Sequence, residues 1–157
     1  MSEINHTDPE LPLIGLLAEL KGAISDELWG RLAERGYGEL RPAHGCVFGY
    51  LGGEGDRLTA LAERSGLTKQ AVGEAVADLE RLGYVERVPD PADGRAKIIR
   101  LSERGREARA EAAEIFSDIE GRFAAEVGDE RFDEFRATLL DLWRLIRAPE
   151  RSAARAA

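Results

Sequence analysis

The stretch 83–105 constrains the fold of this chain more than any other. Residues 84–88 and 96–101 are rich in β-branched side chains, and Asp93-Gly94 between them is a strong turn signal. Ser102 then offers a side chain that can cap a following helix. The sequence therefore predicts a β-hairpin that leads directly into a helix.

A helix-turn-helix pattern comes immediately before this hairpin. Residues 59–65 read as a short helix that ends at Gly66, and Thr68 is placed to cap a second helix that runs to Leu82. The buried face of the second helix is expected to contain Val72, Ala75, Val76, Leu79 and Leu82. Two short helices around a glycine-containing turn, followed by a hairpin, predict a winged helix-turn-helix.

Amphipathic helices are predicted on both sides of this core, over residues 9–35, 42–51 and 103–127, and from 130, after the break at Gly128-Asp129, to 147. The expected fold is mainly α with a small β-wing, in a single structural domain. Its expected parts are an N-terminal helix (1–40), the winged helix-turn-helix (41–105), two C-terminal helices (106–147) and a frayed tail (148–157).

The apolar stripes of the flanking helices predict self-association. The last helix carries Phe132, Phe135, Leu139 and Trp143 along one face. Burying one such side chain contributes about 1.5 to 3 kcal/mol, so the stripe is costly to leave in water. A symmetric homodimer built from the terminal helices is the simplest way to cover it.

The net charge of −8 argues against a nucleic-acid partner only until its distribution is considered. Residues 1–40 carry 3 basic and 8 acidic side chains, residues 41–105 carry 10 and 10, and residues 106–157 carry 9 and 12. The acidic excess therefore lies in the flanks, and the predicted winged core is neutral. The single cysteine and the absence of a secretory or membrane-spanning pattern lead us to expect a cytoplasmic protein.

The second helix of the helix-turn-helix is the candidate DNA-recognition helix. Gln can pair with adenine, Lys can reach guanine or phosphate, and Glu can accept from cytosine. The outward-facing candidates for DNA contacts are Thr68, Lys69, Gln70, Gly73 and Glu74. The alternative interpretation is an ordinary surface helix of mixed charge.

The hairpin supplies a second set of candidates. Arg95 follows the predicted turn and is placed to enter a narrow minor groove, with Asp93 close enough in sequence to orient its guanidinium. Arg87, Lys97 and Arg100 are weaker candidates for phosphate contacts. All of these charges are also compatible with a solvated hairpin.

These residues together carry a family resemblance. The stretches that carry it are 58–63 (Leu-Thr-Ala-Leu-Ala-Glu), 66–70 (Gly-Leu-Thr-Lys-Gln), 79–85 (Leu-Glu-Arg-Leu-Gly-Tyr-Val), 90–95 (Asp-Pro-Ala-Asp-Gly-Arg) and 101–105 (Leu-Ser-Glu-Arg-Gly). The sequence resembles the MarR family of bacterial transcription regulators. The resemblance implies a homodimer that binds double-stranded DNA at a pseudo-palindromic operator, usually as a repressor released by a small ligand.

The resemblance also assigns residues and shows two departures. Thr68 to Gln70 match the start of the recognition helix, and Arg95 matches the wing-tip arginine. Gly94 stands where a second wing arginine often lies, which is expected to weaken minor-groove binding. Gly73 interrupts the recognition helix at a cost of roughly 1 kcal/mol relative to alanine, and we expect it either to weaken the helix or to permit close approach to DNA.

Family effectors usually enter a crevice between the dimer helices and the DNA-binding lobe, and the resemblance implies a small aromatic or phenolic ligand. The candidate lining residues are Trp29, His44, Phe48 and Phe116, although packing explains each of them as well. A histidine satisfied near the core is the favoured interpretation of His44, and a structural thiol is that of Cys46.

No cofactor, metal site or catalytic residue is predicted. His44 and Cys46 point to different faces of a helix, and the motifs of phosphate loops, zinc proteases and nucleophile elbows are missing. The chain is therefore not expected to be an enzyme. The alternative function is a winged-helix module that docks a protein without specific DNA binding.

Overall fold

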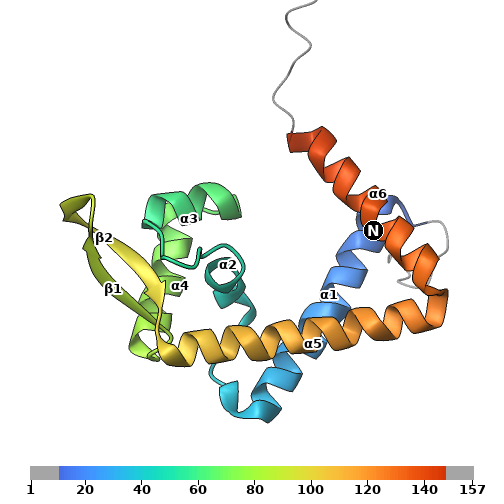
Figure 1. Ribbon diagram of the computed structural model, residues 1–157, viewed down its shortest axis with the longest axis horizontal. Coiled ribbons are helices and arrows are strands. Elements are labelled where there is room, and N and C mark those ends of the chain that lie inside the picture. Colours follow the sequence, from blue (N-terminus) through green and yellow to red (C-terminus); the bar gives the residue numbers. More distant parts are fainter. Residues whose placement is uncertain (1–10, 148–157) are drawn as a thin grey trace, which may run out of the picture. The chain divides into compact units, whose positions relative to one another are not determined.

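The computed structural model describes residues 11–147 (Figure 1). It consists of helices and one two-stranded antiparallel sheet, so the predicted fold class, mainly α with a small β-wing, is confirmed. The chain divides into two compact units, Met1–Ile115 and Phe116–Ala157. No described helix is both long and apolar enough to cross a membrane.

The N-terminal helix α1 covers Leu13–Leu32, and the chain bends at Gly36, near the predicted end of the helix. Leu28 and Leu32, at the C-terminal end of α1, are buried. The predicted start of this helix at residue 9 and the predicted tail 148–157 lie outside the described residues.

The helix predicted over 42–51 is shorter than expected. A 3-10 turn, Pro42–His44, leads into the single turn of α2, Gly45–Phe48. Gly45 and Gly49 explain the difference, because each glycine costs helix stability relative to alanine. Val47 and Leu51 are nevertheless buried in the core of the first unit.

The helix-turn-helix forms as predicted from α3, Leu58–Ser65, and α4, Lys69–Arg81 (Figure 1). Gly66 ends α3 in the left-handed region at φ 69°, a conformation that glycine adopts without steric cost. The Thr68 hydroxyl then accepts a hydrogen bond from the amide of Ala71 at 3.1 Å and caps α4. The buried face of α4 contains Val72, Ala75, Val76 and Leu79, as expected, while Leu82 is half-buried.

The wing differs from the prediction in the position of its turn. The strands are β1, Val85–Asp90, and β2, Asp93–Leu101, so the tip is formed by Pro91 and Ala92 rather than by Asp93-Gly94. Asp90 causes the difference, because its side chain accepts a hydrogen bond from the Ala92 amide at 2.8 Å and closes an Asx-type turn.

The register of the wing changes close to its tip. Asp90 pairs with Asp93, whereas Pro89 pairs with Lys97, so residues 94–96 bulge from β2. Arg95 therefore lies on this bulge and not directly after the turn. Just before α3, Asp56 forms a single antiparallel bridge with Ile99 of β2.

The wing joins helix α5, Glu103–Val127, through a close approach of backbones. The Ser102 hydroxyl donates to the Gly83 carbonyl at 2.6 Å and accepts from the Gly105 amide at 3.1 Å, which confirms the predicted cap. A Cβ on Gly105 would overlap the carbonyl oxygen of Tyr84 and lie 3.0 Å from its carbonyl carbon. Glycine at position 105 thus permits the start of α5 to pack against the end of the helix-turn-helix.

A buried tyrosine, Tyr84, stabilises the same junction between the wing and α5. Tyr84 is 0% exposed, and its hydroxyl donates to a carboxylate oxygen of Glu39 at 2.9 Å. The guanidinium of Arg104 lies 4.4 Å from the centre of the Tyr84 ring, pairs with Glu39 and donates to the Leu82 carbonyl. Burial, and then the neighbouring Glu39, raise the pKa of the Tyr84 hydroxyl, so it remains a donor at neutral pH.

The second unit contains the end of α5 and helix α6, Asp129–Arg147. Within it, the rings of Phe123 and Phe132 lie 6.5 Å apart, and Arg136 pairs with Glu120. Many apolar side chains of α6 are nevertheless exposed, among them Phe135, Leu140, Leu142, Trp143, Leu145 and Ile146.

Candidate nucleic-acid interface

The outward face of α4 presents the polar groups expected of a recognition helix. Lys69, Gln70 and Glu74 are exposed, and the Gln70 side-chain amide donates to a carboxylate oxygen of Glu74 at 3.1 Å. This bond holds the amide beside a carboxylate on the exposed surface, where both can meet base edges. Lys69, at the first turn, forms no ion pair with any described residue.

Gly73 was predicted to lie on the same outward face as Gln70 and Glu74, but it is less exposed than either of them. A Cβ at this position would lie 3.8 Å from Cδ2 of Leu58 in α3, which is ordinary van der Waals contact. The side of α4 at Gly73 therefore faces α3, and this geometry favours helix packing over close approach to DNA.

Replacing Gly73 by alanine is expected to stabilise the fold. The substitution removes the backbone entropy of glycine and adds one contact to Leu58, so we expect a gain of up to about 1 kcal/mol in the free energy of unfolding. Denaturant unfolding measures the gain, and DNA affinity should stay within about twofold of the original. A stabilised variant that has lost DNA affinity would show instead that this glycine admits the DNA backbone.

The tip of the wing is held by an arginine that sequence analysis did not identify. Arg57, just before α3, donates from Nε to Oδ2 of Asp90 at 2.7 Å and from Nη2 to the same oxygen at 2.6 Å. Its Nη2 also lies 3.6 Å from Asp93. The hydrogen bond from the Ala92 amide, and then the one from Arg57, lower the pKa of the Asp90 carboxyl group. Arg57 thus ties both ends of the tip to the helix-turn-helix.

Asp93 acts on the backbone of Arg95 and not as predicted on its guanidinium. The Asp93 carboxylate accepts a hydrogen bond from the Arg95 amide at 3.2 Å, and its other contact is to Arg57. Arg57 already occupies this carboxylate, which explains the difference. The Arg95 side chain is exposed on the bulge and forms no ion pair with a described residue.

The remaining basic residues of the wing fall into two groups. Arg87 pairs with Glu80 at 3.0 Å and Arg100 pairs with Glu86 at 2.6 Å, so carboxylates offset both charges. Lys97 is exposed and is not paired with any residue in 11–147. The candidate interface therefore has three cations without a carboxylate partner among the described residues: Lys69, Arg95 and Lys97.

His44, one of the residues predicted to line an effector crevice, is buried and hydrogen-bonded to other residues of the chain. His44 is 2% exposed; its Nδ1 accepts from the Arg41 amide at 3.1 Å, and its Nε2 lies 2.9 Å from Oδ2 of Asp78. The ring is thus hydrogen-bonded on both sides, with the proton on Nε2 facing Asp78. This geometry supports the interpretation of His44 as a satisfied core histidine.

The three aromatic candidates have different environments. The Trp29 indole nitrogen donates to the Ser25 hydroxyl at 3.1 Å, and the Phe48 ring meets the Tyr84 ring edge-on at 6.1 Å. Phe116 is 41% exposed and belongs to the second compact unit. An effector site formed by these residues stays a prediction.

Cys46 has the surroundings of a structural thiol. Its Sγ donates to the Ala43 carbonyl at 3.1 Å, and burial raises the pKa of the thiol, which disfavours the reactive thiolate. Among residues 11–147, no group of three or more His, Cys, Asp or Glu side chains is arranged to hold a metal ion.

Comparisons with known proteins agree with this geometry. Residues 39–96, which include the helix-turn-helix and most of the wing, match the profile of the MarR family. No curated protein sequence matches the chain. A MarR-family transcriptional regulator from Rhodococcus sp. RHA1 has a similar structure, with a TM-score of 0.66 and 26% identity over 83% of this chain and 92% of that one.

Two further structures are similar. CouR from Rhodococcus jostii RHA1, solved with p-coumaroyl-CoA, has a TM-score of 0.66 and 27% identity over 83% of this chain and 90% of its own. A point mutant of MepR from S. aureus, solved with an oligodeoxyribonucleotide, shares the fold at a TM-score of 0.56, with 20% identity over 88% of this chain and 100% of its own. Residues 39–96, which contain the helix-turn-helix and most of the wing, thus match the MarR family, and the structures of similar fold include a transcriptional regulator of that family.

Proposed function

We propose that this chain is a homodimeric, sequence-specific regulator that represses transcription from a pseudo-palindromic operator and is released by a small molecule. The observation that carries the proposal is a set of exposed cations, Lys69 on α4 and Arg95 and Lys97 on the wing, that have no carboxylate partner among residues 11–147. Phosphate contacts depend on such side chains. Phosphate binding depends on where cations lie, so the acidic total charge of the chain does not argue against it.

The two elements are suited to different grooves. The α4 helix fits the major groove, where Gln70 can pair with adenine and Lys69 can reach guanine or phosphate. Arg95 on the bulge of β2 fits the narrow, electronegative minor groove beside it.

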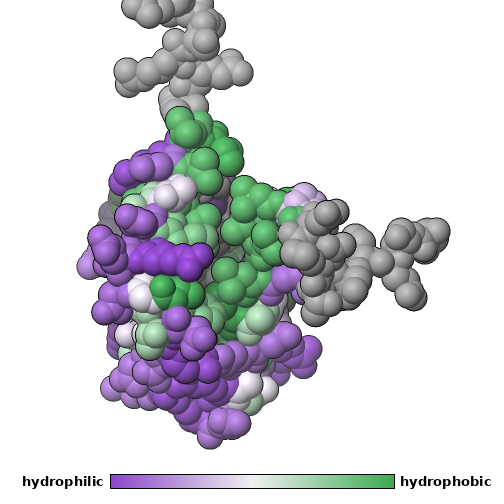
Figure 2. Space-filling view, turned by 90° about the vertical axis from the view of Figure 1, so that its right-hand side faces the viewer, coloured by the Kyte–Doolittle hydropathy of each residue, from purple (hydrophilic) through white to green (hydrophobic). Residues whose placement is uncertain are grey.

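The homodimer is supported by exposed apolar side chains on the terminal helices. Figure 2 shows one face of the molecule with apolar residues at its surface. On α1, Ile14 is 74% exposed, and on α6, Leu145 and Ile146 are 72% and 84% exposed. Burying such side chains in a symmetric interface is favourable. Sedimentation equilibrium should give twice the mass of the chain, and a monomer at micromolar concentration would contradict a homodimer.

Selection from fragmented genomic DNA tests specific DNA binding. The purified protein should enrich a short set of fragments that share an inverted repeat, with half-sites about one helical turn apart. If no sequence is enriched at low salt, the winged helix is better explained as a protein-docking module. A reporter gene behind an enriched site then tests repression, since expression should rise when the gene for this chain is deleted.

Replacing Arg57 by alanine is expected to weaken operator binding although Arg57 lies outside α4 and the wing. The tip loses its link to the helix-turn-helix and must be ordered on binding, so we expect affinity about fivefold lower. The matched control is Arg57→Lys, which keeps the charge but loses the forked geometry. If Arg57 positions the wing, lysine should restore little affinity. Full restoration by lysine would indicate a simple phosphate contact.

Replacing Gly94 by arginine is expected to strengthen DNA binding. A Cβ at position 94 meets no described atom within 4 Å, so the bulge has room for a side chain next to Arg95. One more phosphate contact should make the dependence of log affinity on log salt steeper by about 0.9 per subunit. Gly94→Gln is the uncharged control, and an equal slope in both variants would contradict an approach of this bulge to DNA.

A further inference from the structure

Recognition helix α4 carries three carboxylates, and Glu74 is the one that no cation neutralises among residues 11–147. Asp78 pairs with Arg81, and Glu80 pairs with Arg87 at 3.0 Å. Glu74 lies on the exposed face of α4, which the proposed function directs toward DNA. A free carboxylate on that face repels phosphates, so Glu74 lowers affinity for DNA unless it contributes something else to binding.

The partner of Glu74 is the side-chain amide of Gln70, one helical turn earlier. Nε2 of Gln70 donates to Oε1 of Glu74 at 3.1 Å. An ionised carboxylate only accepts hydrogen bonds, so it faces the NH2 end of the amide and not its oxygen. The bond therefore fixes the orientation of the amide and engages one of its N–H groups, which leaves Oε1 and the second N–H of Gln70 for a base.

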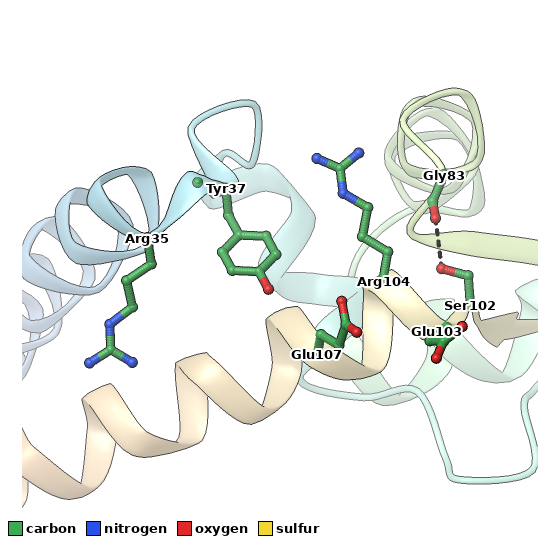
Figure 3. A pocket seen from close by; sticks show the side chains of 8 residues that line it. Arg35, Tyr37, Gly83, Ser102, Glu103, Arg104 and Glu107 are labelled. Atoms are coloured by element: carbon green, nitrogen blue, oxygen red, sulfur yellow. Dashed lines mark hydrogen bonds between the residues drawn. The ribbon is translucent and has the colours of Figure 1, made fainter.

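The helix that carries this pair is held at both ends. Thr68 caps its first turn by accepting from the Ala71 amide at 3.1 Å. Just after its last turn, the Gly83 carbonyl accepts from the Ser102 hydroxyl at 2.6 Å, the bond drawn in Figure 3. The exposed neighbours of the pair include Ala71 and Ala77, whose methyl groups are small. The amide is thus presented from a fixed helix, with room for a base edge to reach it.

We propose that Glu74 is a positioning residue for sequence readout, which holds the Gln70 amide so that it reads adenine and rejects guanine and thymine. This role presupposes the DNA binding proposed above. Adenine presents the N7 acceptor and the N6 donor, which match the second N–H and Oε1 of the amide.

The selectivity comes from the bases that the fixed amide excludes. Guanine presents two acceptors and thymine one, so either base would meet the amide oxygen with an oxygen of its own. An amide that is free to turn over would offer these bases an N–H instead and would discriminate less. The cost of the Glu74 charge in affinity is therefore offset by a gain in specificity.

NMR spectroscopy tests the hydrogen bond without DNA. The side-chain NH2 signals of Gln70 are compared in the full chain, in Glu74→Ala and in Glu63→Ala, which removes an exposed carboxylate of α3 as a matched control. We expect one of the two NH2 protons to move upfield in Glu74→Ala, because it loses its acceptor, and to stay in place in Glu63→Ala. Identical signals in all three proteins would overturn the proposal.

A double-mutant cycle tests the effect on readout. The original chain, Gln70→Ala, Glu74→Ala and the double variant are bound to a selected operator with every single base change in one half-site. At the base pair where Gln70→Ala abolishes discrimination, Glu74→Ala should reduce a preference for adenine of about tenfold to about threefold or less. Affinity for a scrambled duplex should rise by up to about threefold, because a repulsive charge is lost.

The cycle also separates positioning from direct reading by Glu74. In the Gln70→Ala background, Glu74→Ala should cause no further change in discrimination, because Glu74 acts through the amide. Loss of discrimination at another base pair, independent of Gln70, would refute the proposal and make Glu74 a reader of cytosine itself. Unchanged discrimination in Glu74→Ala would refute it too. If selection enriches no sequence, the proposed function fails and this role with it, whereas specific binding that ignores Glu74 refutes this role alone.

Discussion

Replacing Gly105 by alanine is expected to lower the free energy of unfolding by about 3 kcal/mol or more, the largest effect of any single methyl group in the wing junction. The added Cβ would overlap the Tyr84 carbonyl oxygen, and backbone atoms have no rotamer with which to escape. Relief requires α5 to move away from the end of the helix-turn-helix. That movement would strain the bonds of the Ser102 hydroxyl to Gly83 and Gly105.

Gly121→Ala is the matched control for this substitution. It lies in the same helix, and its added Cβ meets no described atom within 4 Å. We therefore expect a stabilisation of up to about 1 kcal/mol from helix propensity alone. Chemical denaturation of both variants measures the difference. Similar stability of Gly105→Ala and Gly121→Ala would show that α5 does not pack this closely against Tyr84.

Replacing Arg95 and Gln70 by alanine, one at a time, is expected to produce two different losses in operator binding. Arg95→Ala should weaken binding about tenfold or more, mainly on operators with A/T-rich flanks, because a narrow minor groove attracts an arginine. Gln70→Ala should cost about 1 to 3 kcal/mol and relax discrimination at one base pair in each half-site. Binding to a panel of duplexes with single base changes separates these two patterns.

Ala77→Ser provides a control for this pair. Ala77 is exposed and lies in the C-terminal half of α4, away from the N-terminal end at which recognition helices contact bases. Its substitution should change affinity by less than about twofold. If the losses for Arg95→Ala and Gln70→Ala were the same on every duplex, neither side chain would read sequence.

The helix-turn-helix was predictable because its signals are local. Gly66 and Thr68 lie in the turn that they determine, and the apolar spacing of α4 follows the helix period. Arg95 was also placed on the exposed end of the wing from its sequence neighbours alone. These features depend on contacts between residues a few positions apart.

The position of the turn at the wing tip could not be predicted from the local sequence, because it depends on a contact with a distant residue. Asp93-Gly94 has the stronger turn signal, yet the turn forms at Pro91 and Ala92 because Asp90 is fixed by Arg57, 33 positions earlier in the chain. A pair at that separation leaves no periodic pattern. Asp90 was the one signal in the sequence for the observed turn, because an Asx turn needs an aspartate or asparagine at its start.

The central claim is that α4 and the wing read a DNA sequence together. The most direct test compares the affinity of the protein for a selected operator with its affinity for a scrambled duplex of equal length and composition, over a range of salt concentrations. We predict an operator affinity at least about a thousandfold higher at physiological salt, with affinity for both duplexes falling steeply as salt is raised. Equal affinity for the two duplexes, or binding that does not respond to salt, would contradict the account.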